Sequence, residues 1–514
     1  MSRIVFAVLT LMVTVGIYTA SADDESPFFY FYSSELDAFV IERADGTDSR
    51  ILTEYNLPNE NLVISGAGWS PSQNWFAWYA GSPILRGKLD GDAMLVNYDG
   101  EQVLTVKEQC SPDLMQWSTV DDLLLIGCYR AQQSPLDYVY IVFDPNDQTE
   151  VLTLDANSLG LSGNISSPIS EAHWSPDGRN LVVYHANSVD IDEALYSMKI
   201  FTLDGTLSAE RTFRTEYLDY SQPFWSNTGN VLYSNSDASK IVVENFRDNL
   251  VMEFDTVGHQ IGWVDWSQSG DYAFVYGIRI SPFIDDHGNS NPVWLLSLRE
   301  ESLTLLSETA RFWNLSRQAD RFYITTTWSP VADIGFIVDA SNTLSLIFPS
   351  SGETVLLHEA TNTDYELFPQ FVRWHDNSGS LTIVEYNLRE YQGTFSDLDI
   401  DSNQILSTFD AHVMFDNFTY SSSGQYLAYS SSDCDGICIL DSTKDETLQV
   451  SFSYPPDRTG AAMELLWHPE SDWLIALGNP DGALRWLNVL SSNGSVNRSI
   501  GECAVTLACF GWMP

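Results

Sequence analysis

The segment AHWSPDGRNLVVYH, residues 172–185, contains the pattern that decides the fold of this chain. A short apolar run ends at Trp174. Residues 175–178 (SPDG) then combine a restricted φ angle, side-chain hydrogen-bonding groups and a glycine, which together favour a tight turn. The alternating β-branched and aromatic residues of 181–185 predict a strand after the turn. The segment therefore predicts two antiparallel strands joined by a turn that begins just after a tryptophan.

The same phrase recurs throughout the chain at intervals of 41 to 62 residues. Its anchors are Trp69, Trp117, Trp174, Trp225, Trp266, Trp328, Trp374, Tyr420, Trp467 and Trp512. Each unit also contains a second polar turn, as in NYDGEQV (97–103), so each unit predicts a four-stranded antiparallel meander. Repeats of this size are typical of the blades of an all-β propeller, and a bulky Trp near the inner end would fill the wedge between blades.

The phrase resembles the Trp-Ser-Pro-Asp-Gly repeat of TolB-like β-propellers, which are WD-repeat-like in architecture. The match is closest at residues 174–178, whereas other copies keep the Trp and the turn character but lose Pro, Asp or Gly. The resemblance covers nearly all of residues 23–514. It implies the fold and is almost silent on function, because such propellers serve as scaffolds, carriers and accessory domains of enzymes.

The two ends of the chain complement each other. Residues 27–54 predict three strands of a blade without a preceding Trp phrase, and residues 504–512 predict one first strand that ends at Trp512. Pairing them would complete one composite blade and protect strand edges, which gives ten blades in one ring. The alternative is two smaller tandem propellers, with a division near residues 310–321.

The N-terminus predicts a secretory signal peptide at residues 1–22. Arg3 precedes an apolar stretch that is short for a membrane span, and Ala20, Ser21 and Ala22 form a small-residue cleavage pattern. We therefore expect an exported protein, extracellular or periplasmic, with no membrane span after cleavage; an uncleaved anchor is the alternative.

The chain is strongly acidic, with 70 Asp and Glu against 24 Lys and Arg and a formal net charge of −46. Such a field repels nucleic acid and anionic lipid, so we expect neither as a partner. High solubility is the simplest consequence of this charge, and cationic partners or divalent cations are compatible with it.

Six cysteines fall into three pairs that are close in the sequence. They are Cys110 with Cys128, Cys434 with Cys438, and Cys503 with Cys509. An even number of cysteines in an exported chain predicts disulfides, each closing a short loop here. The spacing of cysteine and histidine does not support a zinc site.

Motifs for catalysis are missing from the sequence. It contains no G-x-S-x-G elbow, no Gly-rich phosphate loop and no sialidase Asp-box. We therefore expect no cofactor. One segment, SDLDIDSNQ, places Asp397, Asp399, Asp401 and Asn403 at alternate positions, which suggests a calcium loop, although the usual Gly and distal Glu are absent and a solvated strand end is the simpler interpretation.

The residue before each Trp should lie near the mouth of the central channel, and it differs from repeat to repeat. Gln116, His173, Asp265 and Arg373 are the candidate binding residues, because loops and variable positions on one face of a repeat array often bind ligands. We predict a monomeric, secreted, non-catalytic scaffold that binds a protein, peptide or glycan. The alternatives are a propeller hydrolase or lyase acting on extracellular polysaccharide, and a structural component of the cell surface.

Overall fold

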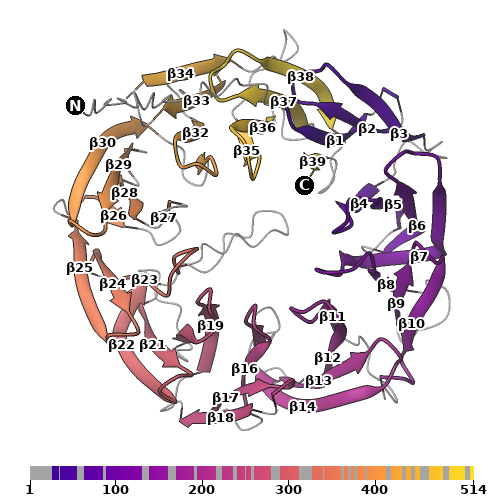
Figure 1. Ribbon diagram of the computed structural model, residues 1–514, viewed down its shortest axis with the longest axis horizontal. Coiled ribbons are helices and arrows are strands. Elements are labelled where there is room, and N and C mark those ends of the chain that lie inside the picture. Colours follow the sequence, from indigo (N-terminus) through magenta and orange to yellow (C-terminus); the bar gives the residue numbers. More distant parts are fainter. Residues whose placement is uncertain are drawn as a thin grey trace, which may run out of the picture.

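The computed structural model shows a single ring of ten radial blades with no helix among the described residues (Figure 1). It describes residues 26–513 except 34, 37, 55–62, 85–87, 130–137, 160–169, 190–193, 216–222, 236–239, 249, 256–259, 279–289, 312–326, 340, 361–363, 368–371, 376–378, 388, 391, 413–417, 431–433, 435, 442–445, 452–461, 479–484 and 504–509. The predicted ten-bladed propeller is confirmed, and the alternative of two tandem propellers is wrong. The predicted signal peptide lies outside the described residues, as does most of the possible division near 310–321.

Blades are numbered here from the composite blade, and each is given from its inner to its outer strand. Blade 1 consists of β39 (Phe510–Trp512), β1 (Phe28–Ser33), β2 (Ala38–Arg43) and β3 (Ser49–Glu54). Blade 2 consists of β4 (Val63–Trp69), β5 (Trp75–Ile84), β6 (Lys88–Asn97) and the first part of β7 (Val103–Trp117). Blade 3 consists of the rest of β7, β8 (Leu124–Tyr129), β9 (Tyr138–Asp144) and β10 (Thr149–Asp155). Blade 4 consists of β11 (Ser170–Trp174), β12 (Asn180–Val189), β13 (Ala194–Thr202) and β14 (Leu207–Thr215). Blade 5 consists of β15 (Phe224–Trp225), β16 (Asn230–Ser234), β17 (Lys240–Asn245) and β18 (Leu250–Asp255).

The second half of the ring repeats this arrangement. Blade 6 consists of β19 (Gln260–Trp266), β20 (Tyr272–Ile278), β21 (Ser290–Ser297) and β22 (Ser302–Arg311). Blade 7 consists of an isolated bridge from Trp328 to Gly335 followed by β23 (Gly335–Val338), β24 (Thr343–Phe348) and β25 (Glu353–Glu359). In blade 8, β26 (Glu366–Leu367) and β27 (Arg373–Trp374) pair with successive parts of β28 (Ser380–Asn387), which β29 (Gln392–Asp399) and β30 (Gln404–His412) follow. Blade 9 consists of β31 (Phe418–Tyr420), β32 (Tyr426–Ser430), β33 (Gly436–Asp441) and β34 (Glu446–Ser451). Blade 10 consists of β35 (Ala462–Trp467), β36 (Trp473–Gly478), β37 (Arg485–Ser491) and β38 (Asn497–Cys503).

The ring closes as the sequence predicts, with the C-terminal strand completing the N-terminal blade. β39 pairs antiparallel with β1, so that Trp512 faces Phe29, and the backbone N–H of Met513 donates to the Phe28 carbonyl at 3.0 Å. Arg498 of blade 10 forms an ion pair with Glu42 of blade 1 on the same seam. The two ends are therefore held by a strand pair, a buried core and an ion pair.

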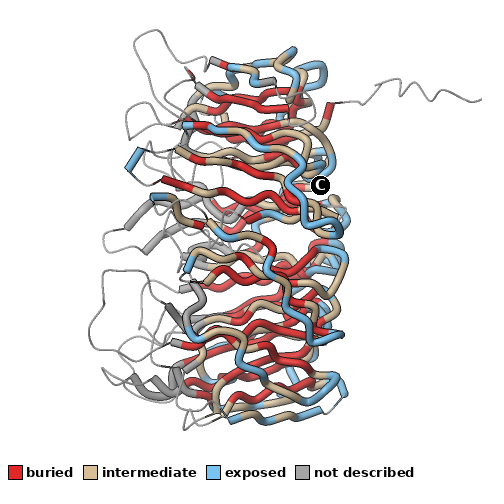
Figure 2. The backbone as a smooth tube through the Cα atoms, turned by 90° about the vertical axis from the view of Figure 1, so that its left-hand side faces the viewer, coloured by how far each residue is buried: buried red, intermediate tan, exposed pale blue. Residues whose placement is uncertain are grey.

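The turn after each Trp is stabilised by its first residue, a serine in seven blades. In blade 4 the Ser175 N–H donates to the Asn180 carbonyl at 2.9 Å, and its hydroxyl accepts from the Asn180 N–H at 3.0 Å. Gly178 adopts a φ of +66°, which only glycine reaches without strain. These contacts confirm the turn that residues 175–178 predict, and exposed turns of this kind gather on one face of the ring (Figure 2).

Candidate functional site

The tryptophans tie each blade to the one before it through a repeated hydrogen bond. The indole N–H of a blade's Trp donates to the backbone carbonyl of the residue that precedes the Trp of the previous blade. The bonds are Trp117 to Gly68, Trp174 to Gln116, Trp266 to Phe224, Trp328 to Asp265, Trp374 to Thr327, Trp467 to Thr419 and Trp512 to Leu466, at 2.9–3.3 Å. The rings themselves are partly or fully buried, so the predicted packing role of Trp is confirmed.

Three junctions depart from this rule. Trp225 donates instead to the hydroxyl of Tyr184 at 2.7 Å, and the buried indole N–H of Trp69 has no hydrogen-bond partner among the described atoms. At the third junction, blade 9 has Tyr420 in place of Trp, so the carbonyl of Arg373 receives no indole N–H. The junction between blades 8 and 9 is therefore built differently from the others.

The four predicted binding residues all lie on innermost strands, which surround the ring axis (Figure 1). Gln116 and His173 are half-buried; the Gln116 amide oxygen is buried without a hydrogen-bond partner among the described atoms, and the His173 ring lies 6.1 Å from that of Tyr184. The four sit on blades 3, 4, 6 and 8, so the structure places them around the ring and does not gather them in one cluster.

Asp265 uses its carboxylate to bridge blades 6 and 7. Its Oδ2 accepts from the backbone N–H of Thr327 at 2.7 Å and from the Thr327 hydroxyl at 2.6 Å. Burial raises the pKa of Asp265 to about 6, against the opposing effect of these two hydrogen bonds. The side chain is thus committed to the adjoining blade.

Arg373 occupies the same position of blade 8, but its side chain forms no hydrogen bond to the next blade. Its side chain is exposed and has no ion pair or hydrogen bond to any described residue. Burial by the surrounding chain lowers the pKa of Arg373, against the opposing effect of the Tyr420 phenol in blade 9. Among the Lys and Arg side chains that the structure describes, Arg373 is the one on an innermost strand. A guanidinium without an ion pair to any described residue therefore lies on an innermost strand.

Strand register places Arg373 at the head of a polar row that crosses blade 8. Arg373 pairs with Thr382 of β28, Thr382 with Asp397 of β29, and Asp397 with Ser407 of β30. The second and third positions of this row are apolar or aromatic in the other blades: Tyr30 and Ile41, Ala77 and Leu95, Leu125 and Val142, Val182 and Ile200, Leu232 and Val243, Phe274 and Leu295, Phe336 and Leu346, Ala428 and Ile439, Ile475 and Val489. Blade 8 alone carries an aliphatic hydroxyl and a carboxylate there.

The polar row is completed by His375, which follows Trp374 where most blades have serine. The His375 Nε2 lies 2.8 Å from the Thr382 hydroxyl, which in turn donates to Asp397 at 2.5 Å, and Ser407 donates to the second oxygen of Asp397 at 2.7 Å. Since the Thr382 proton goes to the carboxylate, His375 must carry the proton on Nε2 and donate it to Thr382. We call His375, Thr382, Asp397 and Ser407 the blade 8 network.

The electrostatics of the network keep Asp397 ionised. Burial by itself would raise the pKa of Asp397, but hydrogen bonds with His375, Thr382 and Ser407 outweigh it and hold the pKa below its usual value. Burial and the negative charge of Asp397 raise the pKa of Tyr420, so the phenol stays protonated. Thr382 is fully buried, so its hydroxyl cannot reach a substrate. The network positions charge and holds the inner strand in place.

The predicted calcium residues are divided between two roles. Asp397 belongs to the blade 8 network, whereas Asp399 accepts from the N–H and hydroxyl of Ser402 in the following turn, at 2.7 and 2.5 Å. Asn403 lies in that turn with a φ of +51°. Within the part of the chain that the structure describes, no three His, Cys, Asp or Glu side chains group closely enough to hold a metal ion. Calcium binding here stays a prediction.

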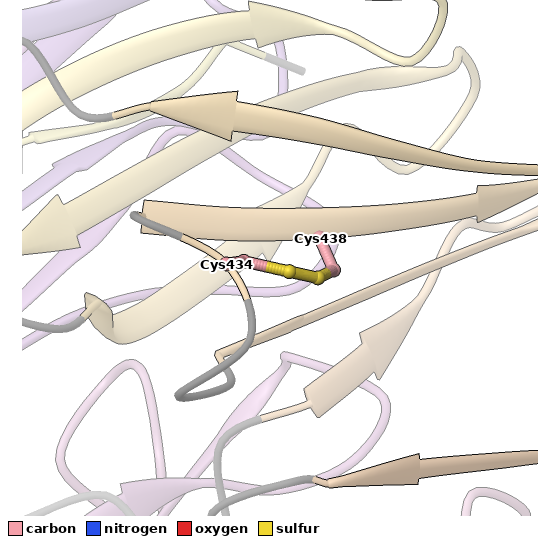
Figure 3. Close-up of a disulfide and its surroundings, with 2 residues drawn as sticks. All are labelled: Cys434 and Cys438. Atoms are coloured by element: carbon pink, nitrogen blue, oxygen red, sulfur yellow. A yellow bond between two sulfur atoms is a disulfide. The ribbon is translucent and has the colours of Figure 1, made fainter.

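One of the three predicted disulfides is seen directly. Cys434 and Cys438 are joined, and both lie in the apolar cluster between blades 8 and 9 (Figure 3). Cys128 is also disulfide-bonded, while the side chain of its predicted partner Cys110 lies outside the described residues, as do those of Cys503 and Cys509.

Sequence reasoning missed the blade 8 network, although the signals were present. When the repeats are superposed on their Trp, His375 replaces the usual Ser, Thr382 interrupts an apolar position, and Tyr420 replaces the next Trp. All three departures fall within one pair of neighbouring blades. Only the strand register shows that they meet Asp397 on one face.

Comparisons with known proteins place the chain by fold and not by sequence. No protein-family model and no curated protein matches it. Among similar solved structures are a prolyl endopeptidase (12% identity, 87% of this chain, 51% of that chain, TM-score 0.38), the β-propeller domain of Cps50 (Swd1) from Myceliophteria thermophila (11%, 74%, 96%, 0.29) and the Dos1 propeller (11%, 87%, 86%, 0.35). The chain spans about half the length of the endopeptidase. The similarity concerns the propeller fold alone.

None of the described segments forms a helix with the length and hydropathy needed to cross a membrane.

Proposed function

We propose that the chain is an exported, non-catalytic propeller that binds a protein, peptide or glycan with the inner ends of its blades. The observation that carries the proposal is the separation of roles on the inner strands. The backbone before each Trp is held by the same indole hydrogen bond in seven junctions, while the side chain at that position changes freely. A fixed backbone with varied side chains is the arrangement of a recognition surface on a rigid scaffold.

Export is supported by the N-terminal apolar segment and by the disulfide chemistry of Cys434, Cys438 and Cys128, which suits an oxidising compartment. The full burial of the Thr382 hydroxyl in the blade 8 network favours binding over turnover at this place. The TolB-like relationship stays part of the proposal, since the fold is shared by many unrelated propellers.

The test is a screen of the purified chain against panels of oligosaccharides and peptides, read for both binding and product formation. We expect saturable binding without turnover, weakened by Gln116→Ala or Arg373→Ala and unchanged by Arg179→Ala, an exposed residue of the turn face. Product formation from an oligosaccharide would replace the scaffold with the hydrolase or lyase alternative. Binding that ignores all inner-strand substitutions would move the site elsewhere.

A further inference from the structure

We propose that Arg373 binds a carboxylate, and that the ligand is a peptide carrying an isolated carboxylate such as its own C-terminus. This inference rests on the proposed function and names the chemistry of one part of that site. It starts from the imbalance of charge in the chain, in which acidic residues outnumber Lys and Arg by 70 to 24. Several described arginines, Arg179, Arg247 and Arg389 among them, form no ion pair with a described carboxylate, but Arg373 is the described cation that lies on an innermost strand.

Four other described cations bind acceptor groups of the chain itself. Arg211 pairs with Glu244, Arg498 with Glu42 and Arg299 with Asp271, while Lys199 donates to the Leu159 carbonyl. Each of these cations ties two strands or two blades together. Arg373 makes no such bond to any described residue and points from an innermost strand.

The carboxylate in the same polar row as Arg373 is already hydrogen-bonded to other residues. Its neighbour in the row, Thr382, is fully buried and already donates to Asp397, and Asp397 has its two oxygens taken by Thr382 and Ser407. The carboxylate that could have paired with Arg373 is thus satisfied by the blade 8 network. The guanidinium keeps its five donors for an outside group, and its planar geometry suits a bidentate carboxylate.

The next blade lacks the indole N–H that the other blades of this half supply at the junction. Everywhere else in the second half of the ring the following Trp fills the junction and takes the carbonyl before the preceding Trp, but here the smaller Tyr420 stands in that place. The Arg373 carbonyl therefore lacks the indole donor that seven other junctions supply, and the guanidinium of the same residue offers the donors that a peptide C-terminus requires.

The net charge decides between a peptide and an acidic glycan. A polyuronate carries a negative charge on each sugar and would be repelled by a chain with a net charge of −46. A peptide carries one terminal carboxylate and can be neutral or basic elsewhere, so the same field attracts the rest of the ligand. The charge distribution therefore favours the peptide.

The experiment uses the full mature chain and a library of random hexapeptides enriched in lysine, prepared with free or amidated C-termini. We expect the wild type to bind the free-acid library about 10- to 100-fold more tightly than the amide library, as a charge-assisted pair allows. Arg373→Gln should abolish the difference and Arg373→Lys should keep part of it. Arg179→Gln is the matched control, because that side chain is exposed on the turn face and lies on no inner strand.

Three results would overturn the inference. They are equal binding of the two libraries, an unchanged preference in Arg373→Gln, and tighter Arg373-dependent binding of an oligogalacturonate than of any peptide. If the chain binds peptides or glycans through Gln116 but not through Arg373, this inference fails while the proposed function stands. If no ligand responds to any inner-strand substitution, both fail. Unchanged thermal unfolding of Arg373→Gln shows that the variant is folded.

Discussion

The junction between blades 6 and 7 and the junction between blades 8 and 9 each begin with a charged residue before a tryptophan, and they use it in opposite ways. The Asp265 carboxylate accepts hydrogen bonds from Thr327, and the Asp265 backbone carbonyl accepts one from the Trp328 indole N–H. Blades 6 and 7 are therefore bonded to each other at this residue. Arg373 gives neither group to blade 9, which has Tyr420 in the Trp place. The first charge holds the scaffold together, and the second is left free for recognition.

The two junctions also differ in their response to pH. Burial raises the pKa of Asp265 to about 6, so ionisation of this carboxyl lowers the stability of the folded state. Hydrogen bonds lower the pKa of Asp397, so its ionised form is the favourable one. Acid should therefore strengthen the junction of blades 6 and 7 and weaken the network within blade 8, beside the junction with blade 9.

The largest effect is expected from Trp328→Ala at the junction of blades 6 and 7. The side chain is 1% exposed, stacks on Phe274 at 4.3 Å and donates its indole N–H to Asp265. Its removal should lower the free energy of unfolding by about 3–5 kcal/mol in urea unfolding. Trp486→Ala on an outer strand is the control and should cost well under half as much; equal losses would remove the special role of the blade Trp.

Asp265→Asn should reveal the pH dependence of the same junction. Because the folded pKa lies above the unfolded value, the wild type loses stability relative to Asp265→Asn as the pH rises from about 4 to about 7, by about 3 kcal/mol at most. Urea unfolding of both proteins across this range measures the difference. A constant difference, or one that grows in the wild type's favour, contradicts the assignment.

The disulfide gives an intermediate effect at the junction of blades 8 and 9. Replacing both Cys434 and Cys438 by Ser should lower stability by about 2 kcal/mol, since the bond closes only a short loop. The bonded cysteines (Figure 3) belong to the buried apolar cluster against which Tyr420 packs. Thermal unfolding without reductant is the measurement, and an unchanged midpoint would mean that the bond contributes nothing.

Asp397→Asn should have a smaller effect, with the opposite pH dependence to Asp265→Asn. At neutral pH the variant should be less stable by about 1–2 kcal/mol, because Thr382 and Ser407 lose their charged acceptor. The difference should shrink below about pH 4, where the wild-type carboxyl takes up its proton. A difference that persists in acid would show that charge is not what holds the network.

Most of the fold could be predicted from the sequence, because each blade repeats one local pattern. The turn after Trp174 follows from residues 175–178, and the closure of β39 on β1 follows from counting strands at the two ends. The indole hydrogen bond between blades could not be predicted. It joins residues in different repeats, and the spacing of the repeats says nothing of the angle between blades.

The candidate site was predictable only in part. Arg373 was selected as a variable residue before a Trp, but its freedom depends on Asp397, which the sequence pattern suggested as a calcium ligand. The pairing of Arg373, Thr382 and Asp397 across three strands is a matter of register, and one residue of slippage would place them on opposite faces. The strand order and register had to be seen before these residues could be connected.

The most direct test of the central claim, that Arg373 on an inner strand is free whereas Arg211 and Arg498 are held by carboxylates, is its reactivity toward phenylglyoxal, followed by peptide mass spectrometry. We predict that Arg373 reacts as readily as the exposed Arg179 and Arg247, whereas Arg211 and Arg498, held by Glu244 and Glu42, react slowly. A slow reaction at Arg373, at the rate of Arg211 or below it, would show that its guanidinium is occupied within the ring and would contradict the account.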